Sequence, residues 1–425
     1  MENCGNSCYI DSVIFAMFHD GMNESYDGIL VQDLKDDKTS AVQRILRDVV
    51  VTQLRRREAV KAPDMSKLRL ALNLCGWEGF AVGSGGNEDV RRLVEMGFSH
   101  QHAVLSLIAN DGKVDSAISQ LLSRDPGMDT EIDKSIMSKY RQQDALEFLQ
   151  FFLDLLKAPR IPFSQRILKN MGGSAPAAKS STDMKYVTDR AVLLNLVQQP
   201  KNLFATSRNA VRLEDLLRRH FYDDQIEVAG ASSQSKSVLK VLKLSPFYTN
   251  DCEIDGCTYN GEASLFPNFI IPIVLLRYGY NSSASKNSCP VAFPETLDVS
   301  RYIDKDSSLP LPEYMLVLRS LVLHVGDRAN EGHYVSIGRN SEIFDGAGGW
   351  VLHDDLKKPV RPLPAWKKLQ DLCQERKLSL EKDTYILFYQ LQHRTAAYTD
   401  EELAKQIARY ERQRRLKDEN ICSVS

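Results

Sequence analysis

The sequence NCGNSCYIDS at residues 3–12 places Cys8 where a short polar loop meets an apolar segment. Ser12 can cap residues 13–18, which are all apolar, so a helix is expected just after the loop. Amides at a helix N-terminus stabilise negative charge, and a nucleophilic cysteine reacts as its thiolate. Taken alone, the pattern fits a packing cysteine better than a nucleophile, so the choice depends on the rest of the chain.

The composition is that of a globular protein without strong charge. The 425 residues carry 54 basic and 56 acidic side chains, which gives a net charge of −2, and 43% of them are hydrophobic. A chain of this length is expected to form two or three domains, and its neutral charge gives no support to nucleic acid as the main partner. No apolar run approaches the roughly 20 residues of a membrane span, and residues 13–18 are too short for a secretion signal.

The cysteines are sparse. They stand at Cys4, Cys8, Cys75, Cys252, Cys257, Cys289, Cys373 and Cys422. This spread predicts a reduced chain in the cytoplasm, or in the nucleus, rather than a disulfide framework. Because no Cys-x-x-Cys pair occurs, a zinc site of the usual four-cysteine spacing is not expected.

Hydrophobic periodicity divides the chain into a helical first part and a strand-rich second part. Helical spacing occurs within residues 40–75, and a long helix is expected from 132 to 156. The strand-like segments come later, at 238–242, 269–276, 314–325, 334–337 and 385–390. Helices first and strands later predict an α+β protein with a helical lobe and a sheet lobe.

Five further segments form a series with residues 3–12. They are YRQQDALEFL at 140–149, FPNFII at 266–271, FPETLD at 293–298, GHYV at 332–335 with Trp350 and the acidic pair 354–355 after it, and YILFY at 385–389. In this order the six segments resemble the motifs of the ubiquitin-specific proteases, a family of cysteine deubiquitinases. Because they are collinear over residues 3–390, the resemblance covers nearly the whole chain.

The resemblance implies a papain-like cysteine protease fold with thumb, palm and fingers. Cys8 matches the family's nucleophile, His333 its general base and Asn3 its oxyanion-stabilising side chain. The acidic residue that orients the histidine falls on Asp354 when counted from Trp350, with Asp345 as the competing candidate.

The same resemblance implies a channel for the C-terminal tail of ubiquitin. Gln143 and Asp144 are expected to contact the tail, where an acidic group can pair with an arginine. Gly332 and Tyr334 are expected to flank the narrow part of the channel beside His333, where only Gly-Gly passes. For Gln143 and Asp144, the plainer alternative is the polar face of an amphipathic helix.

The interval between Cys8 and Gln142 is longer than the family usually needs, and residues 87–124 have a pattern of their own. NEDVRRLVEMGF at 87–98 resembles the first helix and the Met-Gly-Phe loop of a ubiquitin-associated domain, which is a three-helix bundle. Transferred here, that loop and the third helix point to a ubiquitin-binding set: Met96, Gly97, Phe98, Leu121 and Leu122. A bundle with a purely structural or docking role is the alternative.

The predicted organisation is a catalytic domain at residues 1–86 and 125–395, interrupted by this bundle and followed by a charged helix and tail at 396–425. In the fingers, Cys252 and Cys257 have no second cysteine pair, so no metal is expected. The last four residues, CSVS, follow a basic stretch and fit a prenylation signal on Cys422. Membrane association is expected only with that modification.

Together these features predict a cysteine isopeptidase that removes ubiquitin from proteins or splits polyubiquitin through a thioester on Cys8. The expected partners are ubiquitin, polyubiquitin chains and ubiquitinated proteins, with no nucleic acid and no cofactor. Two alternatives stay open: an inactive ubiquitin-binding scaffold on the same fold, and a protease for another ubiquitin-like modifier.

Overall fold

The computed structural model describes most of the chain between residues 1 and 393. The described residues are 1–20, 24–77, 86–98, 103, 106–107, 110, 113–122, 142–169, 184–196, 210–222, 224–227, 237–244, 269–278, 285–303, 314–340, 349–357 and 362–393. The chain forms two compact units. The first comprises Met1–Gly21, Tyr26–Ala158 and Val322–Leu369, and the second comprises Met22–Ser25, Pro159–Leu321 and Gln370–Ser425.

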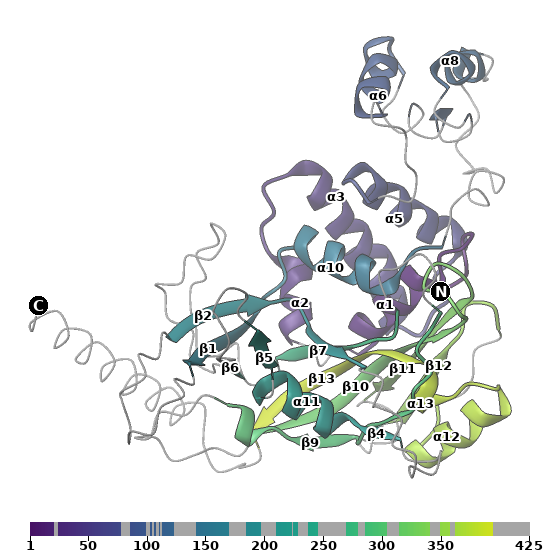
Figure 1. The fold of residues 1–425 in the computed structure, drawn as a ribbon. Coiled ribbons are helices and arrows are strands. Elements are labelled where there is room, and N and C mark those ends of the chain that lie inside the picture. Colours follow the sequence, from purple (N-terminus) through teal and green to yellow (C-terminus); the bar gives the residue numbers. More distant parts are fainter. Residues whose placement is uncertain are drawn as a thin grey trace, which may run out of the picture. The chain divides into compact units, whose positions relative to one another are not determined.

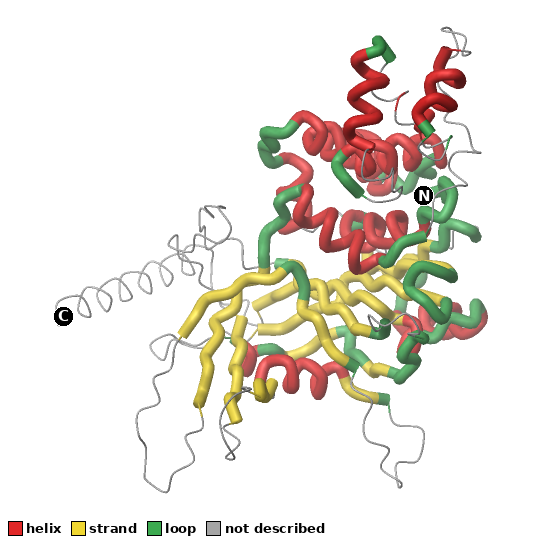
Figure 2. The backbone as a smooth tube through the Cα atoms, turned by 45° about the horizontal axis from the view of Figure 1, so that its top comes forward, coloured by secondary structure: helices red, strands yellow, loops and turns green. Residues whose placement is uncertain are grey.

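Most of the described helices belong to the first unit (Figures 1 and 2). They are α1 (Cys8–Phe18), α2 (Glu24–Val31, which enters this unit at Tyr26), α3 (Asp37–Arg44), a π-helical segment (Ile45–Val51), α4 (Thr52–Arg55), α5 (Ala62–Leu74), α6 (Gly86–Glu95), α8 (Val114–Leu122) and α10 (Ala145–Leu155). None of the described helices combines the length and the apolar character that a membrane crossing requires.

Helix α1 is buried along its whole length, because residues 13–18 are apolar on every side of the helix. It packs against α10 through aromatic side chains. Phe18 meets Phe152 at 6.4 Å between ring centroids, and Tyr9 meets Phe148 edge-on at 5.7 Å. The helix that carries Cys8 is therefore held inside the core of this unit.

The start of α1 differs from the prediction. The helix begins at Cys8, so Ser12 lies inside it and the predicted Ser12 cap is wrong. Ser7 occupies the cap position without bonding a helix amide; its hydroxyl donates instead to the Asp11 carboxyl at 2.8 Å. It also accepts a hydrogen bond from the Cys4 amide at 3.0 Å, which closes the loop in front of the helix.

Strands β11 (His333–Asn340) and β12 (Gly349–His353) form an antiparallel pair in the first unit. The end of α1 approaches β11 at Gly338, where an added Cβ would lie 2.2 Å from the His19 ring. The two ring nitrogens of His19 lie 2.9 Å from the carbonyl oxygens of Phe15 and Arg339. A glycine at 338 therefore allows the close contact that fixes α1 against β11.

Helix α5 presents apolar residues on two sides. Leu68 and Leu72 are buried, and Leu70 belongs to a separate cluster with the core of the bundle formed by α6 and α8. The buried members of that cluster are Leu70, Val90, Leu93, Ala103, Leu107, Ala117 and Leu121. Leu74, one helical turn after Leu70, packs against the same cluster. The bundle is thus attached to α5 by side chains as well as by the chain itself.

The long helix predicted from residue 132 begins at Ala145 in the described part. Asp144 has an extended backbone (φ −74°, ψ 131°), and its carboxylate accepts a hydrogen bond from the Leu146 amide at 2.7 Å. An aspartate in this position is an N-cap, so the helix begins just after it. The prediction is therefore wrong for residues 142–144, while 132–141 lie outside the described residues.

The second unit holds most of the strands. β1 (Ile161–Lys169), β2 (Met184–Asp189), β5 (Asp224–Glu227) and β6 (Ser237–Leu244) form an antiparallel sheet in the order β2-β1-β6-β5. In a second sheet, β7 (Ile270–Leu276) lies between β13 (Thr384–His393) and β3 (Val192–Asn195). β9 (Thr296–Asp298) pairs with β10 (Tyr314–Val325), which runs on into the first unit.

The remaining described elements are short: β4 (Val211–Arg212), α11 (Leu213–Tyr222), β8 (Val291–Ala292), a 3₁₀ turn (Ser300–Tyr302), α12 (Trp366–Glu375) and α13 (Leu380–Asp383). The five strands predicted from the sequence are all present, within β6, β7, β10, β11 and β13. Most of the described helices precede the strands along the chain, and α11, α12 and α13 follow strands; the predicted α+β class is confirmed.

Arg277, just after β7, is a buried cation that holds several loops of the second unit together. Its guanidinium donates to four carbonyl oxygens, those of Thr384, Asn287, Cys289 and Glu381, at 2.6–2.9 Å. Burial lowers the pKa of Arg277 to about 10. The group still carries its proton at neutral pH, so all of these bonds have a charged donor.

Candidate active site

Cys8 is the first residue of α1 and is almost completely buried. Its thiol donates to Oε1 of Gln142 at a sulfur–oxygen distance of 3.6 Å. Burial raises the pKa of Cys8 to about 12; the backbone amide of Tyr334 opposes this, and the charges of Asp355 and Asp11 add to it. Cys8 is therefore a neutral thiol. Its contact with β11 is at the backbone of Tyr334, the residue that follows His333.

The loop before Cys8 is tightly turned. Gly5 and Asn6 have positive φ angles of 91° and 50°. The Gly5 amide donates to Oδ1 of Asn3 at 2.8 Å, and its carbonyl accepts a hydrogen bond from the guanidinium of Arg69 on α5. Arg69 is fully buried, and its guanidinium carbon lies 5.8 Å from the centre of the Tyr9 ring. The loop is thus held from its own side and from α5.

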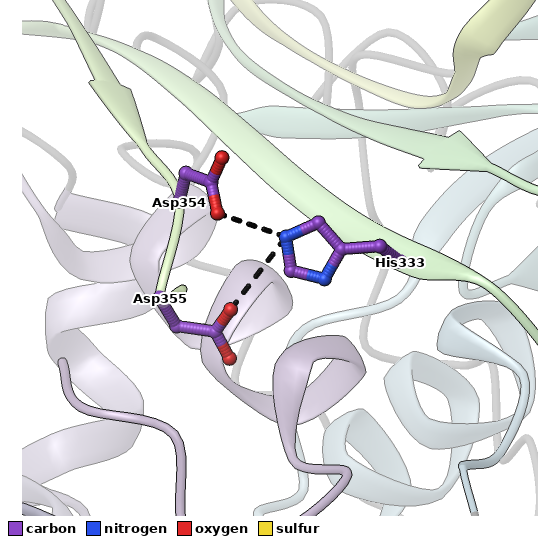
Figure 3. Close-up of side chains that lie close together, drawn as sticks. All are labelled: His333, Asp354 and Asp355. Atoms are coloured by element: carbon purple, nitrogen blue, oxygen red, sulfur yellow. Dashed lines mark hydrogen bonds and ion pairs between the residues drawn. The ribbon is translucent and has the colours of Figure 1, made fainter. Parts of the chain in front are cut away.

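His333, the first residue of β11, faces two carboxylates (Figure 3). Its Nε2 lies 2.9 Å from Oδ1 of Asp354 and 3.7 Å from Oδ1 of Asp355. A hydrogen bond from Nε2 to Asp354 leaves Nδ1 as the nitrogen that can take a proton. Both aspartates directly follow β12, so the turn after that strand carries the acidic side of the site.

Asp354 is ionised at all ordinary pH values. Burial would raise its pKa, but the hydrogen bond and charge of His333 outweigh burial, and the Leu356 amide and Lys357 add to their effect. The net result is a pKa of about 2. The structure therefore brings the predicted pair His333 and Asp354 together. The competing candidate, Asp345, lies outside the described residues.

Asp355 is a site residue that the sequence analysis did not single out. Its Oδ2 accepts a hydrogen bond from Nδ2 of Asn3 at 2.6 Å. Its Oδ1 lies 3.7 Å from Nε2 of His333. The Asn3 amide group is oriented at both ends, because its Oδ1 accepts from Gly5. One N–H of Asn3 is left for a substrate oxygen. The signal that could have found Asp355 is the pair of adjacent acidic residues after a strand.

Gln142, just before the predicted tail-contacting residues Gln143 and Asp144, accepts the hydrogen bond of the Cys8 thiol. Asp144 uses one carboxylate oxygen to cap α10, and Gln143 is half-buried. The resemblance to the protease family selected Gln143 and Asp144 as contacts of the ubiquitin tail, and that role stays a prediction. Because residues 142–144 lie outside the helix and Asp144 is extended, helical spacing does not apply to their side chains.

Gly332 and Tyr334 flank His333 in different ways. Gly332 has φ +103°, and an added Cβ would lie 2.3 Å from the Val325 carbonyl oxygen, so only glycine fits. The Tyr334 ring is fully buried, and its hydroxyl donates to the Ala329 carbonyl at 2.8 Å. Tyr334 therefore offers the site its backbone amide, which faces Cys8, and not its ring.

The comparison with known families decides the assignment. The sequence profile described as ubiquitin carboxyl-terminal hydrolase matches residues 1–389. The chain belongs to the ubiquitin carboxyl-terminal hydrolase family. This confirms the resemblance inferred from the six motifs and the papain-like α+β fold that the resemblance implies.

Individual relatives of this hydrolase-family chain are distant. Ubiquitin carboxyl-terminal hydrolase 9 of Saccharomyces cerevisiae (strain ATCC 204508 / S288c) is 28% identical over 233 residues, which cover 50% of this chain and 27% of that protein. The chain therefore corresponds to little more than a quarter of this relative.

Among solved structures, the SAGA Ubp8/Sgf11/Sus1/Sgf73 DUB module bound to ubiquitin aldehyde matches with 15% identity and a TM-score of 0.49, over 92% of this chain and 69% of that one. A second structure of this module, bound to monoubiquitin, gives 15% identity and a TM-score of 0.48, over 92% and 68%.

The inserted bundle of this family member exposes two of the residues predicted to bind ubiquitin. Met96 is 54% exposed and Leu122 is 70% exposed. Of the other predicted residues, Gly97 adopts φ +96°, and Phe98 is half-buried against the bundle core. Leu121 is buried in that core, so its side chain packs within the bundle.

Three sequence predictions fall outside the described residues. They concern the metal-free finger at Cys252 and Cys257, the charged helix and tail at 396–425, and the lipid on Cys422. Within the described part, His333, Asp354 and Asp355 form the one group of at least three potential donor atoms close together, with those atoms within 4.8 Å of one another. The contacts above place all three in the candidate active site.

Proposed function

We propose that this chain is a cysteine deubiquitinase that hydrolyses the isopeptide bond between the C-terminal glycine of ubiquitin and a lysine of a protein or of another ubiquitin. The supporting observation is the 2.9 Å distance between Nε2 of His333 and Oδ1 of Asp354. The backbone amide of Tyr334, the residue after His333, contacts the Cys8 thiol. Family membership supplies the chemical class. Cys8 is the nucleophile, His333 the general base and Asp354 the residue that orients His333.

In the first half of the proposed reaction, Nδ1 of His333 takes the Cys8 proton and the sulfur attacks the isopeptide carbonyl carbon. The carbonyl oxygen becomes an oxyanion that accepts hydrogen bonds from the free N–H of Asn3 and the Cys8 amide. When the tetrahedral species collapses, the carbon–nitrogen bond breaks. His333 passes this proton to the lysine amine, which leaves the site. Ubiquitin stays bound to Cys8 as a thioester.

In the second half, His333 takes a proton from water, and the hydroxide attacks the thioester carbonyl at the same oxyanion site. Collapse breaks the carbon–sulfur bond, and the Cys8 sulfur takes the proton from His333. Ubiquitin leaves as a carboxylic acid, which releases its proton to water. Asp354 keeps its charge through both halves, because its pKa of about 2 lies far below the working pH. It therefore stabilises the imidazolium each time that it forms.

The direct test uses ubiquitin with a C-terminal propargylamide, which reacts with a properly placed thiolate. The wild-type chain should form a covalent adduct, located at Cys8 by peptide mass analysis, and Cys8→Ala should form none. The matched control is Cys75→Ala, since Cys75 is a half-buried cysteine of the same unit. Ubiquitin binding without an adduct would favour the inactive scaffold. Labelling only by a probe built on another modifier would favour a protease for that modifier.

We further propose that the bundle binds a second ubiquitin, so that polyubiquitin chains are the preferred substrate. The support is the exposure of Met96 and Leu122, because apolar side chains exposed beside a loop suit an apolar patch on a partner. Two linked sites raise the effective concentration of a chain at Cys8.

The second site is tested with the double variant Met96→Ala/Leu122→Ala. It should cleave linkage-defined diubiquitins about tenfold more slowly, with no change on a fluorogenic mono-ubiquitin amide. Arg91→Ala on the exposed side of α6 is the control. Equal rates for both variants on all diubiquitins would assign the bundle a structural role. A cytoplasmic or nuclear location, ubiquitinated proteins as substrates and the lack of a nucleic-acid partner stay predictions.

A further inference from the structure

Gln142 is a buried side chain beside the Cys8 sulfur that the proposed mechanism does not use. It is 9% exposed, and its Oε1 accepts the hydrogen bond of the Cys8 thiol at 3.6 Å. Its Nε2 is buried as well, and no acceptor in the described part of the chain bonds to it. A buried N–H donor without an acceptor is costly, so such a group next to a nucleophile calls for a functional reason.

The chain next to Gln142 is tied to both elements of the site. The Ala145 amide, at the start of α10, donates to the Tyr334 hydroxyl at 3.4 Å. Tyr334 is the residue after His333 on β11. Helix α10 also packs against α1, which begins with Cys8. The carboxamide of Gln142 is therefore kept beside the sulfur by contacts with the elements that carry the base and the nucleophile.

The contact between Gln142 and Cys8 changes its sense when the thiol reacts. A thiol donates a hydrogen bond to the carboxamide oxygen, whereas a thiolate only accepts. An oxygen 3.6 Å from a thiolate would repel it. A half-turn about the last side-chain torsion, which is soft and roughly two-fold, exchanges Oε1 and Nε2. Because Nε2 has no acceptor within the described residues, the half-turn breaks no hydrogen bond of that nitrogen.

We propose that Gln142 is a further catalytic residue: once His333 has taken the Cys8 proton, the Gln142 carboxamide N–H donates a hydrogen bond to the Cys8 thiolate. The step moves one proton, from the sulfur to Nδ1 of His333, and the carboxamide changes only its hydrogen-bond partner. The negative charge of Asp355 disfavours the thiolate, and a donor at the sulfur offsets part of this cost. This inference rests on the proposed hydrolase function, in which Cys8 is the nucleophile.

The test compares Gln142→Met with Gln142→Glu. Methionine fills nearly the same volume without a donor, and an ionised glutamate keeps the shape but offers only acceptors. The readout is the rate at which iodoacetamide alkylates Cys8 at about pH 8, because this rate follows the thiolate fraction and needs no ubiquitin. We expect Q142M to lower it about tenfold and Q142E to lower it further. On a fluorogenic ubiquitin amide, kcat should fall by a similar factor with little change in KM.

The matched control is Gln43→Met. Gln43 is a buried glutamine of the same unit, and its Nε2 already donates to the Ile29 and Gln32 carbonyls. Its loss should lower the melting temperature and leave the alkylation rate of Cys8 unchanged. Alkylation of Q142M at the wild-type rate would overturn the proposal. A higher KM in Q142M with unchanged kcat would also overturn it, and would assign the N–H to substrate binding instead.

Failure of this proposal and failure of the proposed function give different results. If the wild type cleaves the ubiquitin amide and Q142M is alkylated normally, only the role of Gln142 is wrong. If no ubiquitin probe reacts at Cys8, the hydrolase function is wrong, while the alkylation rates still report on the contact between Gln142 and Cys8. If Q142M does not fold, Q142E decides, since alkylation of Q142E at the wild-type rate would show that no donor is needed at this position.

Discussion

At the scale of single residues, the site is a set of side chains that hold one another in place. Asn3 is oriented by Gly5 and Asp355, and His333 by Asp354. None of these contacts gives catalytic power alone. They matter because donors that are already aligned need no reorganisation when charge develops in the transition state.

The two aspartates beside His333 are expected to differ in how much each contributes to kcat. Asp354→Asn should lower kcat roughly 10²- to 10⁴-fold with little change in KM, because a neutral amide neither stabilises the imidazolium nor selects the ring tautomer. Asp355→Asn should cost less through His333, since its oxygen lies 3.7 Å from Nε2 against 2.9 Å for Asp354. Steady-state rates on a ubiquitin amide measure both variants. A larger loss for D355N would mean that the two roles are reversed.

Ionised Asp354 also sets a limit at acid pH. Its pKa is about 2 in the folded chain against an ordinary value of 3.8, so its contribution to folding stability is complete above about pH 4 and is lost as the pH falls toward 2. Thermal melting points of the wild type should therefore fall more steeply than those of D354N over this range. Parallel curves for the two proteins would contradict the assigned pKa.

At the scale of elements, the site depends on how α1 meets β11, because α1 begins with Cys8 and β11 begins with His333. The contact at Gly338 and His19 fixes the distance between the two elements far from the reacting atoms. A small change there is transmitted along two rigid elements, so it should act on activity as well as on stability.

Gly338→Ala tests this contact. The new Cβ would lie 2.2 Å from His19, so the ring must move and its 2.9 Å contact with the Arg339 carbonyl is lost. We expect a destabilisation of about 1–3 kcal/mol in urea unfolding, together with a lower kcat. Gly28→Ala is the matched control, because nothing lies within 4 Å of a Cβ at that position. Similar effects for the two variants would argue against the α1–β11 contact as the reason.

At the scale of the whole molecule, each unit has its own device for holding distant segments together. In the first unit, α5 contacts both the bundle and the loop before Cys8. Leu70 and Leu74 of α5 pack against the bundle core, and Arg69 donates to the Gly5 carbonyl of the loop. In the second unit, Arg277 binds carbonyls from two separate stretches, 287–289 and 381–384. A buried guanidinium group can bind several carbonyl oxygens at once, because one planar group has five N–H donors.

Arg277→Met should destabilise the second unit by on the order of 3 kcal/mol or more, since four carbonyl oxygens lose one buried, charged donor at once. Chemical unfolding followed by far-ultraviolet circular dichroism measures the loss. Arg212→Met is the control: Arg212 pairs with Asp215 on the surface, where an ion pair contributes about 1 kcal/mol or less. Equal losses for the two variants would show that the Arg277 bonds are not needed.

The sequence by itself determined that most helices precede the strands, and it selected Cys8, His333, Asp354 and Asn3 as candidate site residues, because motifs and periodicity are local properties of a chain. It could not determine contacts between residues far apart in number. Asp355 lies 352 positions from Asn3, and Gln142 lies 134 from Cys8. The start of α10 also depended on whether Asp144 capped the helix or continued it. Only the tertiary structure decided these points, since packing α1 against β11 and α10 selects which polar groups meet.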